Sequence, residues 1–392
     1  MKKKTVGLIT SHNGINFGTA LQTFATYAAV ERAGYSCTLI DYMYPTKYHL
    51  TKAKRDENKT KSFIFEKSQL FNYLLLAFKR TLLRISGIKR KQNRKFSDFI
   101  NRIPKTKPFN MLSIVKDPPS FDIFLTGSDQ CWNPRYMHHD LSMLLNFVPD
   151  ETPKLAYAAS FGSSEIAPEF HEEYRKYLLR YDFLSVREKS GCPLIKNLTG
   201  RKDTKYVLDP TFLLKKDEWL ELISAKPFLE EGKFILCYIL NYVFEPYPAL
   251  TDMIAEVRKT YDLPLVFIGK NRYPQDAGDT TVLDAGPEDF LNLMAGAAFV
   301  ITNSFHGTAF SINFRKDFLA VLNPNASLDD RVSNILAATG MQARGVVLGN
   351  SVKEVIKNKT CYSAQNETTI ESLRNESLSF LSDSLKKCAG KK

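Results

Sequence analysis

The chain has 392 residues, which is enough for two domains with complete cores. Its 44% hydrophobic and 24% charged residues are ordinary globular values and exclude wholesale disorder. The net charge of +12 is unevenly placed, because residues 52–116 contain 18 Lys and Arg against 4 Asp and Glu. We therefore expect a globular protein with one basic segment rather than a generally basic one.

The sequence indicates a reducing compartment. The N-terminus has only a short apolar run before His12, which predicts a first strand and not a signal peptide, and no run approaches membrane-spanning length. The six cysteines are scattered, without a C-x-x-C pair or a metal-like spacing. We expect a cytoplasmic protein with free thiols and no metal, and the basic segment would also allow a place at the inner face of the plasma membrane.

The first half of the chain predicts a doubly wound parallel sheet. A strand at 6–10, a polar loop at 11–18, an amphipathic helix at 19–32 and a strand at 35–41 form one βαβ unit. Further strands are expected at 121–126, 154–159, 183–186 and 205–208. Each of these strands ends in a polar cluster, as the strands of ligand-binding open sheets do.

The basic segment allows two interpretations. Apolar residues recur at helical spacing over 71–85, and a basic cluster follows at 89–95. Residues 60–95 could lie on an anionic membrane surface, or they could form a helical hairpin that packs on the protein's own first domain. The segment has no RNP-like or zinc-finger pattern, so we do not expect nucleic-acid binding.

The strand and helix pattern restarts after residue 212. Strands are expected at 234–239, 265–268, 299–301 and 318–322, and helices at 249–261 and 287–297. We place a first Rossmann-like domain at 1–212, with the basic insert at about 52–116, and a second one at 213–365. Residues 366–392 are expected to form a terminal helix that crosses back to the first domain.

One stretch of the second half combines several reactive side chains. Between the strand at 299–301 and a helix expected at 309–314 lie Thr302, Asn303, Ser304, His306, Gly307 and Thr308. Open α/β sheets bind ligands at this position, and free N–H groups at the start of a helix favour anions. The alternative is that the histidine only caps the helix.

Three further residues follow expected strands of the first half. Arg187 could bind a carboxylate or phosphate with its guanidinium fork, or form an ion pair with Glu188 or another nearby acid. Asp129 could act as a general base or only stabilise a turn. Trp132 could stack on a sugar or lie in the core. The pair His138-His139 lacks a second cluster of metal ligands.

Five motifs occur together over most of the chain: residues 16–22 (NFGTALQ), 127–130 (GSDQ) with Trp132, 186–188 (VRE), 208–210 (LDP) and 303–308 (NSFHGT). In order and spacing they resemble the polysaccharide pyruvyl transferases. The resemblance implies two Rossmann-like domains facing across a cleft, similar to GT-B glycosyltransferases. It also implies transfer of the pyruvyl group of phosphoenolpyruvate to paired hydroxyls of a sugar in a cell-surface or exopolysaccharide precursor, which forms a ketal and releases phosphate.

The resemblance also implies roles for particular residues, without any cofactor besides the donor substrate. His306 and Arg187 match the catalytic and anion-binding positions of the family, and Asp129 joins them as a catalytic candidate. The residues expected to hold the donor are Ser304, Gly307, Thr308 and Arg331. The residues expected to hold a free or lipid-linked saccharide acceptor are Asn16, Gly18, Gln22, Gln130 and Trp132.

One departure from the family concerns the second cation. Many members carry Ser-Arg-Leu/Met-His, whereas here Phe305 alone separates Ser304 from His306. Arg331 and Arg315 are the candidates for the missing positive charge. Two other functions stay open at this point. One is a GT-B glycosyltransferase that uses a nucleotide sugar, and the other is a non-catalytic scaffold of a polysaccharide assembly complex.

Overall fold

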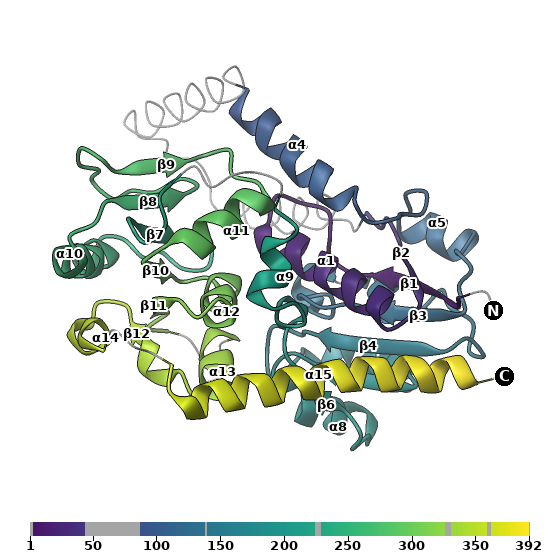
Figure 1. Cartoon of the computed structure of the whole chain (residues 1–392). Helices are drawn as coiled ribbons and strands as arrows, with labels where there is room; N and C mark the ends of the chain where they lie inside the picture. The colour runs from purple at the N-terminus through teal and green to yellow at the C-terminus, as the bar shows by residue number, and fades with distance from the viewer. Residues whose placement is uncertain are drawn as a thin grey trace, which may run out of the picture.

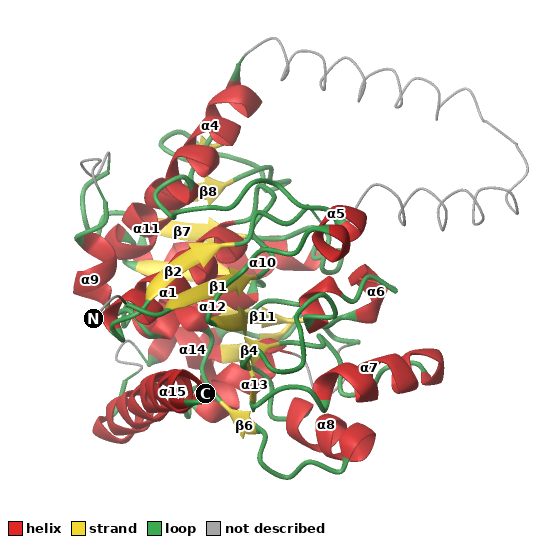
Figure 2. Cartoon of the chain, turned by 90° about the vertical axis from the view of Figure 1, so that its right-hand side faces the viewer, coloured by secondary structure: helices red, strands yellow, loops and turns green. Residues whose placement is uncertain are grey.

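The computed structural model describes residues 3–43, 87–137, 139–223, 229–325, 331–358 and 362–391. The helical face expected at 71–85 lies outside these ranges, as do residues 60–86 of the segment considered for membrane contact and His138. In the described part, two parallel sheets form the body of the protein, one from each half of the sequence. Helices surround both sheets (Figure 1 and Figure 2).

The first sheet has the strand order β2-β1-β3-β4-β5-β6, and every neighbouring pair is parallel. Its strands are β1 (Thr5–Ile9), β2 (Ser36–Leu39), β3 (Ile123–Thr126), β4 (Lys154–Ala159), β5 (Phe183–Val186) and β6 (Lys205–Tyr206). The central strands β3 and β4 are buried along their whole length. This explains why they read as nearly continuous apolar runs instead of alternating patterns.

The second sheet has the order β12-β11-β10-β7-β8-β9, again with parallel neighbours. Its strands are β7 (Ile235–Tyr238), β8 (Leu265–Ile268), β9 (Thr280–Val282), β10 (Phe299–Thr302), β11 (Asp317–Leu322) and β12 (Gly345–Val347). The four longer strands agree with the expectation from sequence. The edge strands β9 and β12 were not predicted, because their three residues each are only partly buried and carry little apolar signal.

The helices that the structure describes are α1 (Phe17–Arg32), α4 (Ile88–Ile100), α5 (Met111–Lys116), α6 (Pro134–Met137), α7 (His171–Leu178), α8 (Gly191–Thr199), α9 (Lys216–Leu220), α10 (Ala249–Tyr261), α11 (Pro287–Gly296), α12 (Phe305–Asn313), α13 (Arg331–Ala338), α14 (Lys353–Lys357) and α15 (Ala364–Gly390). Among the described residues, no helix combines the length and the apolar character needed to cross a bilayer.

Both sheets have a topological switch point. In the first sheet the chain moves from β1 outward to β2 and then returns to β3 on the other side of β1. In the second sheet it moves from β7 through β8 to β9 and then returns to β10 beside β7. Open α/β sheets bind ligands beyond the carboxyl ends of the strands at such points. The loops after β1, β3, β7 and β10 are therefore the expected positions of a site.

The two halves share one continuous apolar core. The ring of Phe17 in α1 stacks on Phe290 of α11 at 5.0 Å between centroids, and it meets Tyr238 of β7 edge-on at 5.7 Å. Phe24, also in α1, contacts the indole of Trp219 in α9 of the second half, with 6.3 Å between ring centroids. An apolar contact of this kind fixes the two sheets relative to each other more firmly than a polar interface between domains would.

Helix α4 explains part of the basic segment. Its apolar residues Phe96, Phe99 and Ile100 are buried in the shared core. One turn apart on the same helix, Lys91 and Lys95 form ion pairs with acidic residues of the second half. The described end of the basic segment thus packs on the protein itself, with part of its charge neutralised. Membrane contact through residues 60–95 stays a prediction.

The C-terminal helix α15 runs from the second half along the first (Figure 1). Near its middle, Ser377 Oγ accepts a hydrogen bond from the backbone N–H of Leu208 at 2.9 Å. One turn earlier, the buried guanidinium of Arg374 donates to Asn313 Oδ1 of α12 and to the carbonyl of Phe212. The helix therefore links the end of α12 to the loop that follows β6.

The ion pairs of α4 provide a test of this link between the halves. Lys95 Nζ lies 2.7 Å from Asp289 Oδ2 and 3.5 Å from Asp284 Oδ2, and its side chain is 31% exposed. We expect Lys95→Ala to lower the free energy of unfolding by about 1 kcal/mol, and by less at high salt because salt screens a partly exposed pair. Urea unfolding at low and high salt measures this.

The matched control is Arg94→Ala, because Arg94 is on the same helix and 83% exposed. It should change the free energy of unfolding by less than about 0.5 kcal/mol. A double-mutant cycle with Asp289→Asn isolates the pair. A coupling energy of zero in that cycle would show that the α4 ion pair does not hold the halves together.

Candidate functional site

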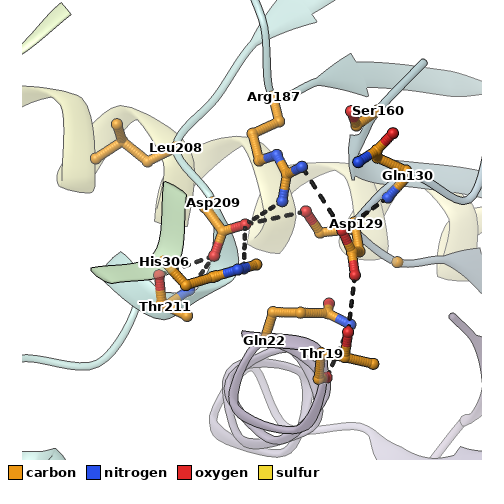
Figure 3. A network of polar contacts seen from close by, with 12 residues as sticks. Thr19, Gln22, Asp129, Gln130, Ser160, Arg187, Leu208, Asp209, Thr211 and His306 are labelled. Carbon is orange, nitrogen blue, oxygen red and sulfur yellow. Dashed lines mark hydrogen bonds and ion pairs between the residues drawn. The ribbon is translucent and has the colours of Figure 1, made fainter. Parts of the chain in front are cut away.

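Four polar side chains from four separate segments meet at the interface of the two halves (Figure 3). Asp129 follows β3 and Arg187 follows β5, both at the carboxyl edge of the first sheet. Asp209 lies in the loop after β6, and His306 belongs to the first turn of α12, directly after β10 of the second sheet. The structure thus brings together the three catalytic candidates from sequence and adds Asp209.

Arg187 is surrounded by carboxylates. Its side chain is 1% exposed; Nη1 donates to Asp209 Oδ2 at 2.8 Å and Nε donates to Glu188 Oε1 at 3.2 Å. Nη2 lies 3.8 Å from Asp129 Oδ1 and has no hydrogen-bond partner among the described residues. The guanidinium also lies over the Phe305 ring, 4.4 Å from its centroid. Burial would lower the pKa of Arg187, but the carboxylates outweigh burial and raise it. Arg187 therefore forms the ion pair with Glu188 that the sequence left open. Its Nη2 group remains available for a ligand.

Asp209 connects the two halves electrostatically. Its Oδ1 accepts hydrogen bonds from the N–H and the hydroxyl of Thr211 at 3.0 and 2.8 Å. Its Oδ2 accepts from Ser128 Oγ at 3.3 Å and from Arg187, and it lies 3.7 Å from His306 Nε2. Burial would raise the pKa of Asp209, but interactions with His306 and Arg187 outweigh it and hold the pKa well below its usual range. The carboxylate therefore stays ionised.

His306 lies inside a helix and not in the loop before it. The helix expected from residue 309 begins at Phe305, because Ser304 caps it by accepting a hydrogen bond from the Gly307 N–H at 3.4 Å. The expected helix start was wrong by about one turn. The imidazole is nearly buried, and its Nε2 has no hydrogen-bond partner among the described residues. This nitrogen points towards Asp209 and is free to bind another group.

Gly18 is in the site because the imidazole packs against its backbone. A Cβ atom at this position would lie 1.9 Å from His306 Nδ1, far inside contact distance. Helix α1 of the first half therefore approaches α12 of the second half at a position that only glycine can occupy without a shift. Because Nδ1 faces this backbone, Nε2 is the nitrogen that remains for chemistry.

Asp129 is held in an unusual backbone conformation. Its φ of 69° lies in the left-handed region, which is uncommon for residues other than glycine and is concentrated at functional sites. Oδ1 accepts from the Gln130 N–H and Oδ2 from Thr19 Oγ1, each at 2.9 Å. Burial would raise the pKa of Asp129, but Arg187 and His306 outweigh it and lower the pKa. The carboxylate is charged and fixed to α1.

Two residues predicted to hold the acceptor, Trp132 and Gln22, are buried inside the first half. The indole of Trp132 is completely buried and its Nε1 donates to the carbonyl of Met143 at 3.1 Å, so the interpretation as a core residue is correct. Gln22 is also completely buried, and its Nε2 donates to the carbonyl of Ser11 at 3.0 Å. Both side chains support the site from within. Asn16, in contrast, is only half-buried where it caps α1.

The proposed donor cradle consists of the first turn of α12. Ser304, Gly307 and Thr308 are buried, and Thr308 Oγ1 donates back to the carbonyl of Ser304 at 3.1 Å. A Cβ atom at Gly307 would lie 2.2 Å from Thr302 Oγ1. The hydroxyls of Ser304 and Thr308 are therefore used to shape the turn. Because Ser304 already accepts hydrogen bonds from the N–H groups of Gly307 and Thr308, what the turn offers a ligand is mainly the positive end of the helix dipole.

Arg331 is the second cation near the site. It begins α13, and its guanidinium carbon lies 6.0 Å from the centroid of the Phe305 ring. The amide of Gln130 lies 3.0 Å from this guanidinium when its oxygen is turned to accept. The other candidate, Arg315, is engaged elsewhere, since its Nε donates to Glu367 of α15 at 2.7 Å. Of the two arginines left open by the sequence, only Arg331 is close to the other site residues.

The charges of the cluster nearly balance. The guanidinium groups of Arg187 and Arg331 face three carboxylates, those of Asp129, Glu188 and Asp209. A proton on His306 would make the cluster neutral. Buried charges are tolerated when they are paired in this way, and without that proton the carboxylates exceed the guanidinium groups by one charge.

The described residues include no group of three or more His, Cys, Asp and Glu side chains arranged to hold a metal ion. His139, one of the two adjacent histidines considered from the sequence, is largely exposed, and its Nδ1 lies 3.0 Å from Glu173 Oε2. This histidine takes part in a surface ion pair.

Sequence reasoning missed Asp209, Glu188 and Thr19 as members of the site. Asp209 precedes a proline at the end of a strand, which reads as a turn or helix cap, and it does cap the 3-10 helix Pro210–Phe212. Glu188 was considered only as a partner that would neutralise Arg187. Asp209 and Glu188 both follow strands at the same edge of the sheet, where side chains come together. This shared position is the sequence feature that could have identified them as members of the site.

Comparisons with known proteins agree with this architecture. A family model described as polysaccharide pyruvyl transferase matches residues 16–325. Among solved structures, the chain is similar to a UDP-GlcNAc 2-epimerase from Neisseria meningitidis bound to UDP-GlcNAc, with 10% identity, a TM-score of 0.53 and coverage of 98% of this chain and 100% of that one. A protein from Listeria monocytogenes described as a UDP-N-acetylglucosamine 2-epimerase gives 12% identity, a TM-score of 0.55 and 98% coverage of both chains.

At these identities the solved structures show the fold alone. They share the GT-B-like pairing of two Rossmann-like domains, so the predicted fold class is confirmed. No curated protein matches the chain.

The close approach at Gly18 predicts a costly substitution. In an ordinary helix Gly→Ala is favourable by about 1 kcal/mol. Here we expect Gly18→Ala to lower the free energy of unfolding by about 1–3 kcal/mol, because the methyl group overlaps the His306 ring and forces the two halves apart. Urea unfolding measures it. Gly390→Ala, at a helical position with no atom within 4 Å, is the control and should be neutral or slightly stabilising. Equal behaviour of the two variants would contradict the contact.

The buried carboxylate of Asp209 predicts a change in acid stability. We expect Asp209→Asn to lower the free energy of unfolding at pH 7 by about 2–3 kcal/mol, since charged hydrogen bonds are lost. In the wild type the native pKa is lower than the ordinary value of 3.8, so the unfolded chain takes up the proton first and this stability is lost as the pH falls below about 4.

The Asp209→Asn variant has no ionisable carboxyl group at this position. Its free energy of unfolding should therefore fall less steeply than that of the wild type between pH 5 and pH 3, by up to about 1.4 kcal/mol per pH unit below 3.8. Asp98→Asn, at a carboxylate that is 66% exposed, serves as the control. Parallel pH profiles for wild type and Asp209→Asn would contradict the lowered pKa.

Proposed function

We propose a specific reaction from the premise that the chain belongs to the polysaccharide pyruvyl transferase family. The protein is accordingly a transferase that acts on a saccharide. The proposed donor is phosphoenolpyruvate, and the proposed acceptor is a sugar of a cell-surface or exopolysaccharide precursor that presents two hydroxyls. The products would be a pyruvyl ketal and inorganic phosphate.

The reaction requires an acid, a base and an anion site. A proton added to C3 of the enolpyruvyl group turns it into a methyl group and makes C2 electrophilic. One sugar hydroxyl adds to C2 and loses its proton. Phosphate then leaves with its bridging oxygen, and the second hydroxyl adds at C2 and closes the ketal. Each hydroxyl gives up one proton, and C3 and the phosphate receive them.

One observation carries the proposal: within the described part of the chain, two buried nitrogen atoms have no hydrogen-bond partner, and both belong to side chains that lie against Asp209. They are His306 Nε2 and Arg187 Nη2, one from each half of the protein. Buried polar atoms are rarely left unpaired, so such atoms in a cluster indicate a missing ligand. A proton donor beside a guanidinium N–H suits the enolpyruvyl carbon and the charged groups next to it.

His306 is the proposed general acid. Its Nδ1 packs against Gly18, so Nε2 is the atom that can transfer a proton. The carboxylate of Asp209 at 3.7 Å stabilises a positive charge on the ring before the transfer. The positive amino end of α12 would attract the phosphate or carboxylate of the donor.

Asp129 is the proposed base for the acceptor hydroxyl. It is ionised and fixed by Thr19, and it lies on the opposite side of Arg187 from Asp209. It is also less buried than Asp209, with 17% of its side chain exposed. The half-buried Asn16 and Gln130 flank it and would hydrogen-bond the sugar. The buried Gln22 and Trp132 would only support these groups.

The test uses phosphoenolpyruvate with acceptors extracted from membranes, with phosphate release and the mass of the ketal product as readouts. We expect His306→Ala to lower kcat by about 10²–10⁴-fold, as the loss of a general acid does. His139→Ala is the matched control, because this histidine is exposed, and it should keep wild-type activity. Near-normal pyruvylation by His306→Ala would refute the assignment.

The variant Arg187→Lys tests whether the fork shape of the guanidinium matters beyond its positive charge. Lysine keeps the positive charge between the carboxylates but cannot present the fork, so we expect a folded protein with a raised KM for phosphoenolpyruvate. A parallel assay with UDP-sugars covers the alternative of a glycosyltransferase. Turnover of a UDP-sugar without any turnover of phosphoenolpyruvate would replace the proposal, and an absence of turnover with both donors would favour the scaffold.

A further inference from the structure

Two exposed tyrosines extend from opposite halves of the protein near the site. Tyr136 belongs to α6 of the first half and is 55% exposed. Tyr242 lies in the loop after β7 of the second half and is 74% exposed. Single exposed rings are ordinary on protein surfaces, but exposed rings that gather around one place mark a binding surface.

The position of Tyr242 is set by the same motif that carries His306. Asn303 follows β10, and its Oδ1 accepts a hydrogen bond from the Leu240 N–H at 2.7 Å while its Nδ2 donates to the Leu240 carbonyl at 3.0 Å. Both ends of one amide thus fix the backbone two residues before Tyr242. The tyrosine is therefore held at the switch point of the second sheet, where ligands bind in such folds.

The surroundings of Tyr242 include residues of both halves. The Asn16 side chain at the start of α1 is one of the groups that act on its phenol. Its electrostatic neighbours are Asp129, Arg331 and Tyr136. Partial desolvation, and then the carboxylate of Asp129, raise the pKa of the phenol. The exposed ring therefore lies beside the polar groups of the site and not on a remote surface.

Tyr136 is attached to the other side of the site. Its N–H donates to the carbonyl of Asn133 at 3.0 Å, and the Asn133 side chain contacts the amide of Gln130. Gln130 follows Asp129 directly and approaches Arg331. One short loop therefore carries the proposed base, a polar contact and an exposed aromatic ring.

We propose that Tyr136 and Tyr242 form the acceptor platform, on which a pyranose ring of the acceptor packs its C–H face while its hydroxyls point to Asp129. This inference rests on the proposed function and adds the residues that recognise the sugar. In this proposal, Tyr136 and Tyr242 have the stacking role that the sequence suggested for Trp132.

The chemistry of the surroundings favours a saccharide. A pyranose has an apolar C–H face, which suits an aromatic ring, and hydroxyls that donate to carboxylates and amides. The neighbouring Asn16, Gln130 and Asp129 provide such acceptors. A nucleoside diphosphate could also stack its base on tyrosine, but its phosphates would meet the carboxylate of Asp129, which like charge disfavours.

The test measures binding without turnover. Saturation-transfer NMR on the full chain with phosphoenolpyruvate present uses methyl glycosides of galactose, glucose, mannose and N-acetylglucosamine, and UDP as the competing probe. We expect at least one glycoside to bind through its C–H face. Tyr242→Ala and Tyr136→Ala should each weaken that binding about tenfold, whereas Tyr242→Phe and Tyr136→Phe should weaken it less than threefold, because stacking needs the ring and not the hydroxyl.

Tyr177→Ala on α7 is the control for loss of a tyrosine elsewhere and should bind as the wild type does. The platform is wrong if no methyl glycoside binds to the wild type, if the alanine variants bind normally, or if UDP is the probe whose binding they lose. These outcomes are separate from the proposed reaction. Glycoside binding that depends on both rings, without pyruvylation, would keep the platform and remove phosphoenolpyruvate as the donor. Pyruvylation with an unchanged KM for the acceptor in both alanine variants would keep phosphoenolpyruvate as the donor and refute the platform.

Discussion

The site depends on one carboxylate that is shared across the boundary between the two halves. Asp209 Oδ2 receives a hydrogen bond from Arg187 at 2.8 Å within the first half and lies 3.7 Å from His306 of the second. Because the carboxylate is buried and its other oxygen is occupied by Thr211, it cannot turn to satisfy one partner at the expense of the other. The imidazole and the guanidinium therefore keep a fixed relation only while the two halves stay in place.

Packing around the site supplies this fixed relation. The aromatic contact between Phe17 and Phe290, the ion pairs of α4 and the polar contacts of α15 all join the halves at different points. Gly18 completes the arrangement, because its missing side chain lets α1 reach the imidazole. The interface thus combines apolar contacts with polar contacts at several points, and the site is one of these points. A site built at such a boundary tolerates little movement, since a small separation would remove the neighbour of His306 without disturbing either sheet.

Much of the fold could be predicted because buried parallel strands have a strong local signal. The runs at β3 and β10 are buried throughout and apolar up to a final threonine, and polar residues follow each of them, so the placement of Asp129 and His306 beyond the carboxyl ends of their strands follows from the pattern. The start of α12 was placed too late because the effect of a serine cap depends on backbone geometry. Trp132 could not be assigned, since an indole suits a core and a sugar equally well. The role of Asp209 depends on contacts between distant segments, which no local pattern contains.

The balance of charge in the site gives the proposed proton a second role. Two guanidinium groups face three carboxylates, so a proton on His306 would remove the net negative charge that repels a phosphate. In the proposed reaction, the proton delivered to C3 would therefore also lower the repulsion that the donor meets in the site. Once that proton has moved to carbon, the proton that Asp129 takes from the acceptor hydroxyl would keep the cluster neutral. The two proposed transfers would thus leave the net charge of the cluster unchanged, while the carboxylate of Asp209 stays ionised between the imidazole and the guanidinium.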